Sequence, residues 1–592
     1  MKKLVLLALA ALALTTACQK DDFLEPKTSA LTEETVFTDS IRTMGFLNRI
    51  YADVGSSFVK QRWSSHGNSE HATDDAEYNF SGTGQVSVQL YSGILTPLAF
   101  YGSGSAAGVN YSSGTGSDFW VTPWQNIRRC NLLLSKLPTT PLSKRMQARM
   151  TGEVRFLRAW YYNQLLICFG GIPIIEDKVY GIEDIINVPR TSYADCVTYL
   201  SKELDAAAAA LPRGNSDYSG PDYGRVTAGA CLGLKSRLLL YAASPLFNGG
   251  AETTDASLAA LVSYPSSSTA RWQAAADAAK AVMDLNLYSL YTDNATKPGY
   301  GYYSVFLQRV NPEYIFFYNR PANKDFEFYY NPPTRGGSTY SMPTQNIVDA
   351  FPMRNGKAIT DPTSGYVATN PYVNRDPRFN YSIIYNSSSI FLASAGRAAP
   401  VYTYEGASTD GFNLNNSFTG YFCRKMCDST TSQSSGASTE RGWPLMRYGE
   451  IVLNYAEALN EVGRTADAMT QIIALRTRAG ILPGTDGRYG IASGISQAAA
   501  RELIRNERHI ELCFEDHRYH DIRRWKIAMV TNNAFNNRMR ITNRGTTAAP
   551  GPYTYSIVPT IRRHNFRPEM YLLPLPDAEI RKVPLLRQNP GW

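Results

Sequence analysis

The sequence predicts a mostly α fold, in which helices come in consecutive pairs and long irregular insertions separate the pairs. Two observations lead to this prediction. Apolar residues recur at helical spacing in several long segments, which favours amphipathic helices. The stretches between the pairs are rich in Pro, Gly, Asn, Ser and Tyr, a composition typical of turns and loops.

The predicted helices follow in chain order at 124–137, 144–170, 192–211, 225–243, 269–285, 445–463, 466–480 and 496–516. The second helix should stop at Gly170 and Gly171, because glycine favours the backbone turn that ends a helix. Alanines and a glycine-containing turn in "YAEALNEVGRTADAMTQIIALR" resemble tetratricopeptide repeats, so we expect a superhelical scaffold of helical pairs. Residues 286–444 are mostly insertion, with a short strand in "EYIFFY".

The N-terminus carries two lysines, an apolar run from Leu4 to Leu14 and the motif "TTAC". Because the run is too short to span a bilayer, it predicts a secretory signal over residues 1–17. "TTAC" resembles a lipobox, with Thr15 where Leu is usual, so we expect cleavage before Cys18 and acylation of that cysteine. Residues 18–31 would be the acylated tether, and its "QKDD" resembles an export signal of Bacteroidetes lipoproteins.

Charge and cysteine content argue against some classes of partner and of cross-link. The net charge of +8 falls to +6 without Lys2 and Lys3, and no block of basic residues occurs, which argues against nucleic acid as a partner. Seven of the eight cysteines remain after lipidation, and their scatter does not resemble a disulfide framework. A local bridge between Cys423 and Cys427 stays open, as does a structural calcium ion in the loops.

The stretch "NERHIELCFEDHRYHDIRRW" raises the question of a metal site. On one continuous helix, His509, Cys513 and His517 stand at i, i+4 and i+8, a spacing that can hold a metal ion. Cys513 and His517 fall with Ile510 and Phe514 on the core-facing stripe, whereas His509 is turned about 80° from His517. Buried cysteine and histidine usually pack without a metal, so we predict no metal site and no cofactor.

Several segments in order resemble the SusD/RagB family of outer-membrane nutrient-binding lipoproteins. They are "DDFLEPKTSALTEETVF", "WVTPWQNIRRCNLLL", "GEVRFLRAWYYNQLLICFGGIPII", "GRVTAGACLGLKSRLLLYAASP", "MRYGEIVLNYAEALNEVG", "ERHIELCFEDHRYHDIRRW" and "YLLPLPDAEIRKVPLLRQNPGW". The resemblance implies a tetratricopeptide-like fold on the outer surface of the outer membrane, working with a TonB-dependent, SusC-like transporter to capture oligosaccharides or other nutrients. It divides the chain into an N-terminal part, 32–310, and a C-terminal part, 311–592, of one compact unit.

The family pattern on the predicted last helix comprises Glu507, Arg508, Glu511, Leu512, Glu515, Arg518, Asp521, Arg524 and Trp525. Its variable positions include His509, Cys513 and His517, which also argues against a shared metal function. Glu507, Glu511 and Glu515, with Arg508 and Arg518 nearby, are expected to form ion pairs that fasten this helix to its neighbours.

Three functions compete. The leading hypothesis is a lipid-anchored glycan receptor at the cell surface, without catalysis. A secreted helical glycoside hydrolase would need two carboxylates across a sugar-sized cleft, and Asp74, Asp75, Glu77 and Asp325 are acidic residues in predicted loops. No "GxSxG", "HExxH" or P-loop pattern occurs. A protein-binding repeat scaffold is the third possibility and overlaps with the first.

A sugar receptor needs flat rings beside hydrogen-bonding groups, because each pyranose offers an apolar face and a rim of hydroxyls. The chain is rich in such rings, with 38 Tyr, 24 Phe and 8 Trp. Two insertions, 63–120 and 302–340, supply the candidates Trp63, Tyr78, Phe80, Trp120, Phe326, Tyr329, Tyr330 and Tyr340, with the amides of Asn79, Asn323 and Asn331 beside them. Trp120 has packing as an alternative role, since it precedes a helix.

Overall fold

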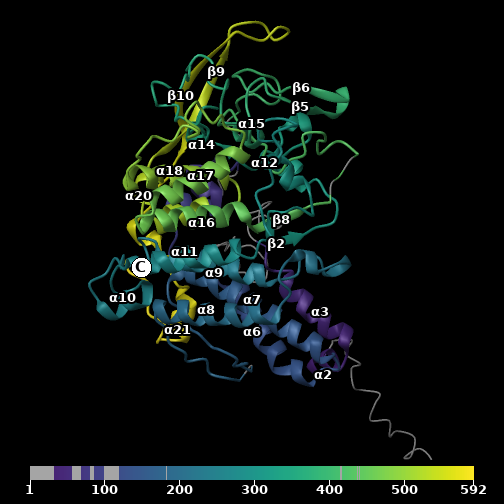
Figure 1. Ribbon diagram of the computed structural model, residues 1–592, viewed down its shortest axis with the longest axis vertical. Coiled ribbons are helices and arrows are strands. Elements are labelled where there is room, and N and C mark those ends of the chain that lie inside the picture. The colour runs from purple at the N-terminus through teal and green to yellow at the C-terminus, as the bar shows by residue number, and fades with distance from the viewer. Residues whose placement is uncertain are drawn as a thin grey trace, which may run out of the picture.

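The computed structural model describes residues 32–55, 68–79, 86–98 and 119–592, apart from 182, 414–416, 437 and 439. Figure 1 shows a stack of helices that rises from the bottom of the molecule to above its middle, an irregular upper part and a long β-hairpin at the top. The main helices of the stack are α6 (Val121–Lys136), α7 (Lys144–Phe169), α8 (Tyr193–Ala210), α9 (Ala228–Ala243), α11 (Thr269–Met283), α16 (Tyr448–Glu461), α17 (Thr465–Arg478) and α18 (Gln497–Glu511).

Shorter helices surround this stack. They are α2 (Glu33–Phe37), α3 (Ser40–Tyr51), α5 (Val86–Ser92), α10 (Ala256–Val262), α12 (Tyr300–Ser304), α13 (Asp325–Tyr330), α14 (Gln345–Ala350), α15 (Pro377–Ser382), α19 (Arg518–Arg524), α20 (Ala528–Thr531) and α21 (Asp577–Lys582). Local sequence explains many of the helix starts, because a serine or threonine oxygen accepts the N–H three residues on. Ser143, Ser192, Thr227 and Ser496 cap α7, α8, α9 and α18 in this way.

Neighbouring helices of the stack pack in sequence order from α6 to α9, then through α11 to α16, α17 and α18. Their apolar faces meet in cores that include Leu165, Leu234 and Ile451, each fully buried. Burial of such aliphatic faces is the main term that stabilises packed helices. The predicted fold class, a mostly α scaffold of helical pairs, is therefore confirmed.

The strands form two-stranded antiparallel sheets in the described parts of the chain. The pairs are β1 (Ala76–Glu77) with β3 (Met342–Pro343), β2 (Tyr314–Asn319) with β8 (Gly442–Arg447), β4 (Ile383–Ile384) with β7 (Phe422–Cys423), β5 (Ser389–Leu392) with β6 (Arg397–Pro400), and β9 (Phe535–Asn543) with β10 (Tyr553–Arg563). The predicted strand in "EYIFFY" is β2, and it pairs with β8.

Two of the helix starts that differ from the prediction have a clear structural cause. The segment 445–463 starts as strand, because residues up to Arg447 pair with β2 and the helix begins only at Tyr448. The segment 225–243 begins at Ala228, since Thr227 is its cap. In both places a tertiary or capping contact overrides the helical periodicity of the sequence.

The segment 496–516 is not one continuous helix, so the predicted i, i+4, i+8 geometry of its His and Cys residues is wrong. Helix α18 ends at Glu511, and Phe514 and Asp516 adopt positive φ angles of 60° and 64°. The Lys425 ammonium donates to the carbonyl oxygens of Glu511 and Cys513, each at 2.9 Å. A buried cation thus satisfies carbonyls that the helix end leaves open.

Ion pairs fasten α18 as predicted, with arginines from other elements as the main partners. Glu507 binds Arg476 at 2.9 Å, and Glu511 binds Arg447 at 2.9 Å and also Arg478. Further pairs join Arg378 to Glu507 and Glu511, Arg447 and Lys425 to Glu515, Arg508 to Asp521, and Arg518 to Asp74. Because these charges are buried, each one needs its partners.

In the described residues, no helix is long and apolar enough to cross a membrane. The cysteines in this part of the chain, including Cys423 and Cys427, are buried and unbridged. Cys18 lies outside the described residues. The division at residue 310 stays a prediction.

Candidate functional site

The pairing of β1 with β3 brings the two predicted aromatic insertions together. Glu77 stands opposite Met342 in this short antiparallel sheet. The residues that flank the paired positions, Tyr78 and Tyr340, therefore lie side by side, with ring centroids 6.1 Å apart. Sequence spacing alone gives no such pairing, since the two strands are separated by most of the N-terminal half.

Tyr78, Phe328, Tyr329 and Tyr340 form what we call the first aromatic cluster. Tyr340 is central, with ring centroids 5.5 Å from Tyr329 and 6.1 Å from Phe328. Its backbone N–H donates to the carbonyl of Tyr329 at 2.9 Å. Tyr78 and Tyr329 are each 1% exposed, whereas Tyr340 and Phe328 are partly exposed. These two rings are the part of the cluster that borders the surface.

Phe328 was not among the predicted residues, although it stands between two of them in "DFEFYY". The stretch forms the short helix α13, and helical spacing separates its rings into two sets. Phe326 and Tyr330 stack on each other at 6.0 Å, and Phe326 contacts Trp443 in the core. Both are at most 1% exposed, so their rings lie in the interior of the upper part.

The predicted amides differ in what they contact. Asn79 Nδ2 donates to the carbonyl of Ser338 at 3.1 Å, while its Oδ1 is buried without a hydrogen-bond partner among the described residues. Asn331 Nδ2 is also buried, and it has no hydrogen-bond partner among the described residues. Asn323 accepts from the N–H of Asp325 and donates to the carbonyl of Pro321, so it serves as a local cap. Buried polar atoms without partners are uncommon in folded proteins and need an explanation.

The structure separates Trp120 from these rings. It is 6% exposed and packs edge-on against Trp124 at 5.7 Å and Phe169 at 5.1 Å, in the core of the helical stack. Packing, the alternative role stated for this residue, is what the structure shows. Trp63 and Phe80 lie outside the described residues.

Segment 68–79, which carries Tyr78, is fastened by its acidic residues. Asp74 makes two contacts with Arg518, at 2.8 and 2.7 Å, and Asp75 contacts His509. Glu77 accepts from Asn536 at 3.0 Å. Burial by itself raises the pKa of Asp74, but the guanidinium of Arg518 outweighs burial and holds that pKa at about 2. The four acids weighed for a hydrolase are thus engaged, since Asp325 also pairs with Arg320.

Asp74, Asp75 and His509 are the group of possible metal ligands found among the described residues. His509, Cys513 and His517, which were weighed and rejected as metal ligands from the sequence, do not share one helix, because α18 ends before Cys513. Arg518 already occupies both oxygens of Asp74. We therefore describe this group as an ion-pair network that joins segment 68–79 to α18 and α19.

His71 packs against Tyr78 of the first aromatic cluster. Its ring stacks on Tyr78 with centroids 4.9 Å apart, and its Nδ1 accepts the N–H of Asn68 at 3.0 Å. Burial, together with Arg562, lowers the pKa of His71 to about 3. The ring is therefore neutral near pH 7 and packs as an apolar plate under the tyrosine.

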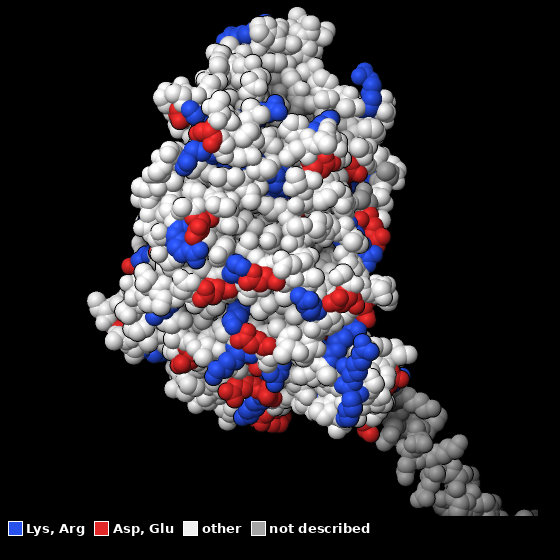
Figure 2. All heavy atoms as spheres, in the orientation of Figure 1, with Lys and Arg blue, Asp and Glu red and all other residues white. Residues whose placement is uncertain are grey.

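Charge is distributed unevenly over the face seen in Figure 2. Lys, Arg, Asp and Glu side chains gather over the lower, helical part and lie more sparsely over the upper part.

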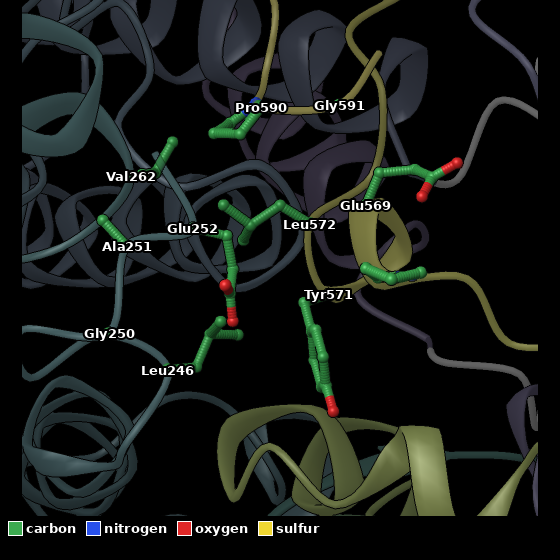
Figure 3. A pocket seen from close by; sticks show the side chains of 11 residues that line it. Leu246, Gly250, Ala251, Glu252, Val262, Glu569, Tyr571, Leu572, Pro590 and Gly591 are labelled. Carbon is green, nitrogen blue, oxygen red and sulfur yellow. The ribbon is translucent and has the colours of Figure 1, made fainter. Parts of the chain in front are cut away.

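A separate cavity of about 240 Å³ lies where the C-terminal segment meets the loop before α10. Figure 3 shows Glu252 pointing among Leu246, Leu572 and Tyr571, while the carboxylate of Glu569 points away. Glu252 is paired with Lys526. None of the predicted ring or amide residues lines this cavity.

Comparison with known proteins gives the family. A model described as the SusD family matches residues 308–592, and a model described as "Starch-binding associating with outer membrane" matches residues 45–240. The chain belongs to the SusD/RagB family. A SusD-like protein P2 of Formosa agariphila is 32% identical over 161 residues, which span 27% of this chain and 28% of that relative.

Solved structures of this family share the fold over nearly the whole chain. A SusD-like protein from Bacteroides fragilis has a TM-score of 0.74 at 24% identity, covering 95% of this chain and 99% of its own. A SusD-like carbohydrate-binding protein from the same species has a TM-score of 0.71 at 23% identity, covering 93% and 100%. Surface glycan-binding protein A from Bacteroides fluxus has a TM-score of 0.58 at 18% identity, covering 94% and 100%.

Proposed function

We propose that this SusD/RagB protein is a lipid-anchored receptor at the outer face of the outer membrane, which binds a glycan and delivers it to a TonB-dependent, SusC-like transporter. Membership of the family supports the proposal. The similarity to proteins described as carbohydrate-binding and glycan-binding supports it as well. We infer that the protein is not an enzyme.

The observation that carries the proposal is the first aromatic cluster. Tyr340 and Phe328 offer partly exposed rings, and Tyr78 and Tyr329 hold them from behind. Asn79 Oδ1 and Asn331 Nδ2 supply polar atoms whose hydrogen-bonding capacity is unused within the described protein. Rings with amide groups nearby suit a sugar, because a pyranose presents an apolar face and hydroxyls at its rim.

The same geometry disfavours glycoside hydrolysis. Hydrolysis needs one carboxylic acid that donates a proton and a second carboxylate across the scissile bond. Asp74, Asp75 and Glu77 are buried against basic or amide partners, and the lowered pKa of Asp74 keeps it ionised. Asp74 therefore serves as a structural anion, and Asp75 and Glu77 are engaged with His509 and Asn536.

Native gels cast with starch, laminarin, xylan or alginate test glycan binding. We expect one of these polysaccharides to retard the protein, and Tyr340→Ala to weaken that binding by about 1–3 kcal/mol, the scale of one lost aromatic contact. Tyr180→Ala, a partly exposed tyrosine in the lower half, is the matched control. Failure of all four polysaccharides to retard the protein, or release of reducing ends from them by purified protein, would contradict the proposal.

Two further experiments test the anchor and the partner. Cys18→Ser should release the protein from the outer-membrane fraction, because a lipoprotein cysteine carries more than one acyl chain and these hold it stably. Full retention of this variant in the membrane would refute lipid anchoring at Cys18. Affinity purification from detergent-solubilised outer membranes should recover a barrel transporter, and its absence would remove the delivery step from the proposal.

A further inference from the structure

A second row of aromatic rings lies where the β9–β10 hairpin meets the body of the protein. Six tyrosines follow one another from ring to ring, with centroids 4.5–6.4 Å apart at each step. In spatial order they are Tyr402, Tyr404, Tyr553, Tyr555, Tyr372 and Tyr385. They come from three separate segments of the chain, so only the folded protein assembles them.

The two ends of this row differ. At the inner end, Tyr372 is 7% exposed and its hydroxyl bonds that of Tyr421 at 3.2 Å, while Tyr385 donates to Asn380 at 2.9 Å. At the outer end, Tyr402 and Tyr553 are partly exposed, and their hydroxyls have no hydrogen-bond partner among the described residues. Core packing accounts for the inner rings, whereas the outer hydroxyls remain accessible to a ligand.

The outer rings are held rigidly. In the hairpin register Tyr553 stands opposite Asn543 and Tyr555 opposite Ile541, which is 1% exposed. The N–H of Glu405 donates to the carbonyl of Ile541 at 2.9 Å and fixes the segment that carries Tyr402 and Tyr404 beside β9. Rings held in this way lose little conformational entropy when they bind a ligand.

We propose that Tyr402, Tyr553 and Tyr555, called here the tyrosine platform, bind an oligosaccharide at a site separate from the first aromatic cluster. Tyr404, which is 5% exposed, packs against Tyr402 and Tyr553 and supports them. The proposal rests on the glycan-binding function proposed above. Consecutive rings suit consecutive sugar faces, and the phenol hydroxyls suit sugar hydroxyls, since both donate and accept. The nearby carboxylate of Glu405 is engaged with Arg538 and Arg540, at 3.3 and 3.2 Å.

The hairpin sets the distance between the two sites. At the base of β10, Arg562 donates to the backbone carbonyl of Tyr78 in the first aromatic cluster. Tyr555 precedes Arg562 by seven residues on the same strand, which corresponds to roughly 20 Å at the usual strand rise. A ligand that touches only the first cluster therefore does not reach the platform, whereas a long chain can touch both.

The test compares the double variant Tyr402→Ala/Tyr553→Ala with the wild-type protein and with Tyr180→Ala, in native gels cast with starch, laminarin, xylan or alginate. We expect the double variant to bind the retarding polysaccharide about ten-fold more weakly, which corresponds to about 1.4 kcal/mol. The melting temperature should match the wild type, because both rings lie at the surface. Unchanged affinity of the double variant, with Tyr340→Ala still impaired, overturns the platform and leaves the proposed function standing.

A second variant guards against a folding defect. Tyr402→Phe/Tyr553→Phe keeps both rings and removes only the hydroxyls, so it should fold normally and bind about three-fold more weakly, within the scale of hydrogen bonds lost. Wild-type affinity of this variant together with a misfolded alanine variant overturns the proposal. If none of the four polysaccharides retards the wild-type protein, both the platform and the proposed function are overturned.

Discussion

The helical stack and the upper part of the molecule are stabilised by different contacts. In the stack, aliphatic side chains such as Leu165 fill the space between regular helices, whose backbone groups bond one another. In the upper part the core consists largely of aromatic rings on irregular backbone. Irregular backbone leaves carbonyls without a ladder, and buried basic side chains meet them there.

Arg375 and Lys425 illustrate this role. Arg375 donates to the carbonyl oxygens of Pro371, Val348 and Phe351 at 2.9, 2.5 and 2.7 Å. Lys425 binds the two carbonyls at the end of α18. Single basic side chains therefore satisfy, on irregular backbone, carbonyls that regular helices satisfy with their own N–H groups.

The largest expected effect is the loss of stability when one of these basic side chains is removed from the upper part. Arg375→Ala leaves three buried carbonyls unpaired, and we expect about 3–9 kcal/mol of lost stability at about 1–3 kcal/mol for each unpaired group. Urea denaturation followed by fluorescence measures the free energy of unfolding. Arg544→Ala, on the exposed hairpin loop, is the control and should change it little. A loss below about 1 kcal/mol for Arg375→Ala would refute the role given to this arginine.

A core substitution in the stack sharpens the comparison. Leu165 is fully buried in α7, and Leu165→Ala should cost about 2–5 kcal/mol, the sum of lost transfer energy and a residual cavity. Its effect should fall on the whole molecule, because α7 packs between α6 and α8. Urea denaturation measures this loss as well. A change in the free energy of unfolding near zero would mean that the surrounding helices close the gap.

The third expected effect is a loss of stability in acid. Burial lowers the pKa of His71 from 6.5 to about 3, so between these values only the unfolded chain takes up the proton. The free energy of unfolding should therefore decrease as the pH falls from 6.5 towards 3. The ion pair of Asp74 contributes fully above pH 3.8 and is lost as the pH falls through about 2.

Urea titrations of the wild type and of His71→Asn at pH 7, 6, 5 and 4 measure this dependence. The variant should show a shallower slope of stability against pH, because one buried imidazole no longer contributes. Identical slopes in the two proteins would show that His71 is protonated to the same extent in both states.

The smallest expected effect lies on the surface of the lower half. The side chain of Ile185 is 90% exposed in the loop before α8. Ile185→Ala should change the free energy of unfolding by less than about 0.5 kcal/mol, as surface substitutions usually do. A larger loss would indicate that this loop contacts the body more closely than its exposure implies.

The sequence was a reliable guide where structure is local. Each predicted helix exists, because apolar periodicity and capping residues act within a few turns of the chain. Helical periodicity gave the wrong structure at Arg447, which pairs with β2 as a strand. It also failed after Glu511, where α18 ends and Lys425 donates to the Glu511 carbonyl. Both failures come from contacts with residues far away in sequence, which no local pattern contains.

For the candidate site, the structure brings together some of the rings that the sequence singled out and separates others. Tyr78, Tyr329 and Tyr340 do come together, whereas Phe326 and Tyr330 turn into the core and Trp120 packs among helices. Phe328 and the tyrosines of the hairpin were missed. An amphipathic ring suits a core and a surface equally well, so composition alone does not distinguish its two roles.

The sequence by itself determined the family, the helical scaffold and the expectation of an acylated Cys18, because each depends on residues close together in the chain. Tertiary structure alone decided which rings meet, which acids are neutralised and where α18 ends. The pairing of β1 with β3 joins Tyr78 to Tyr340, and Arg518 reaches Asp74 across 444 residues of chain. Such contacts form only when the whole chain folds, since the free energy that holds them comes from burial shared by distant segments.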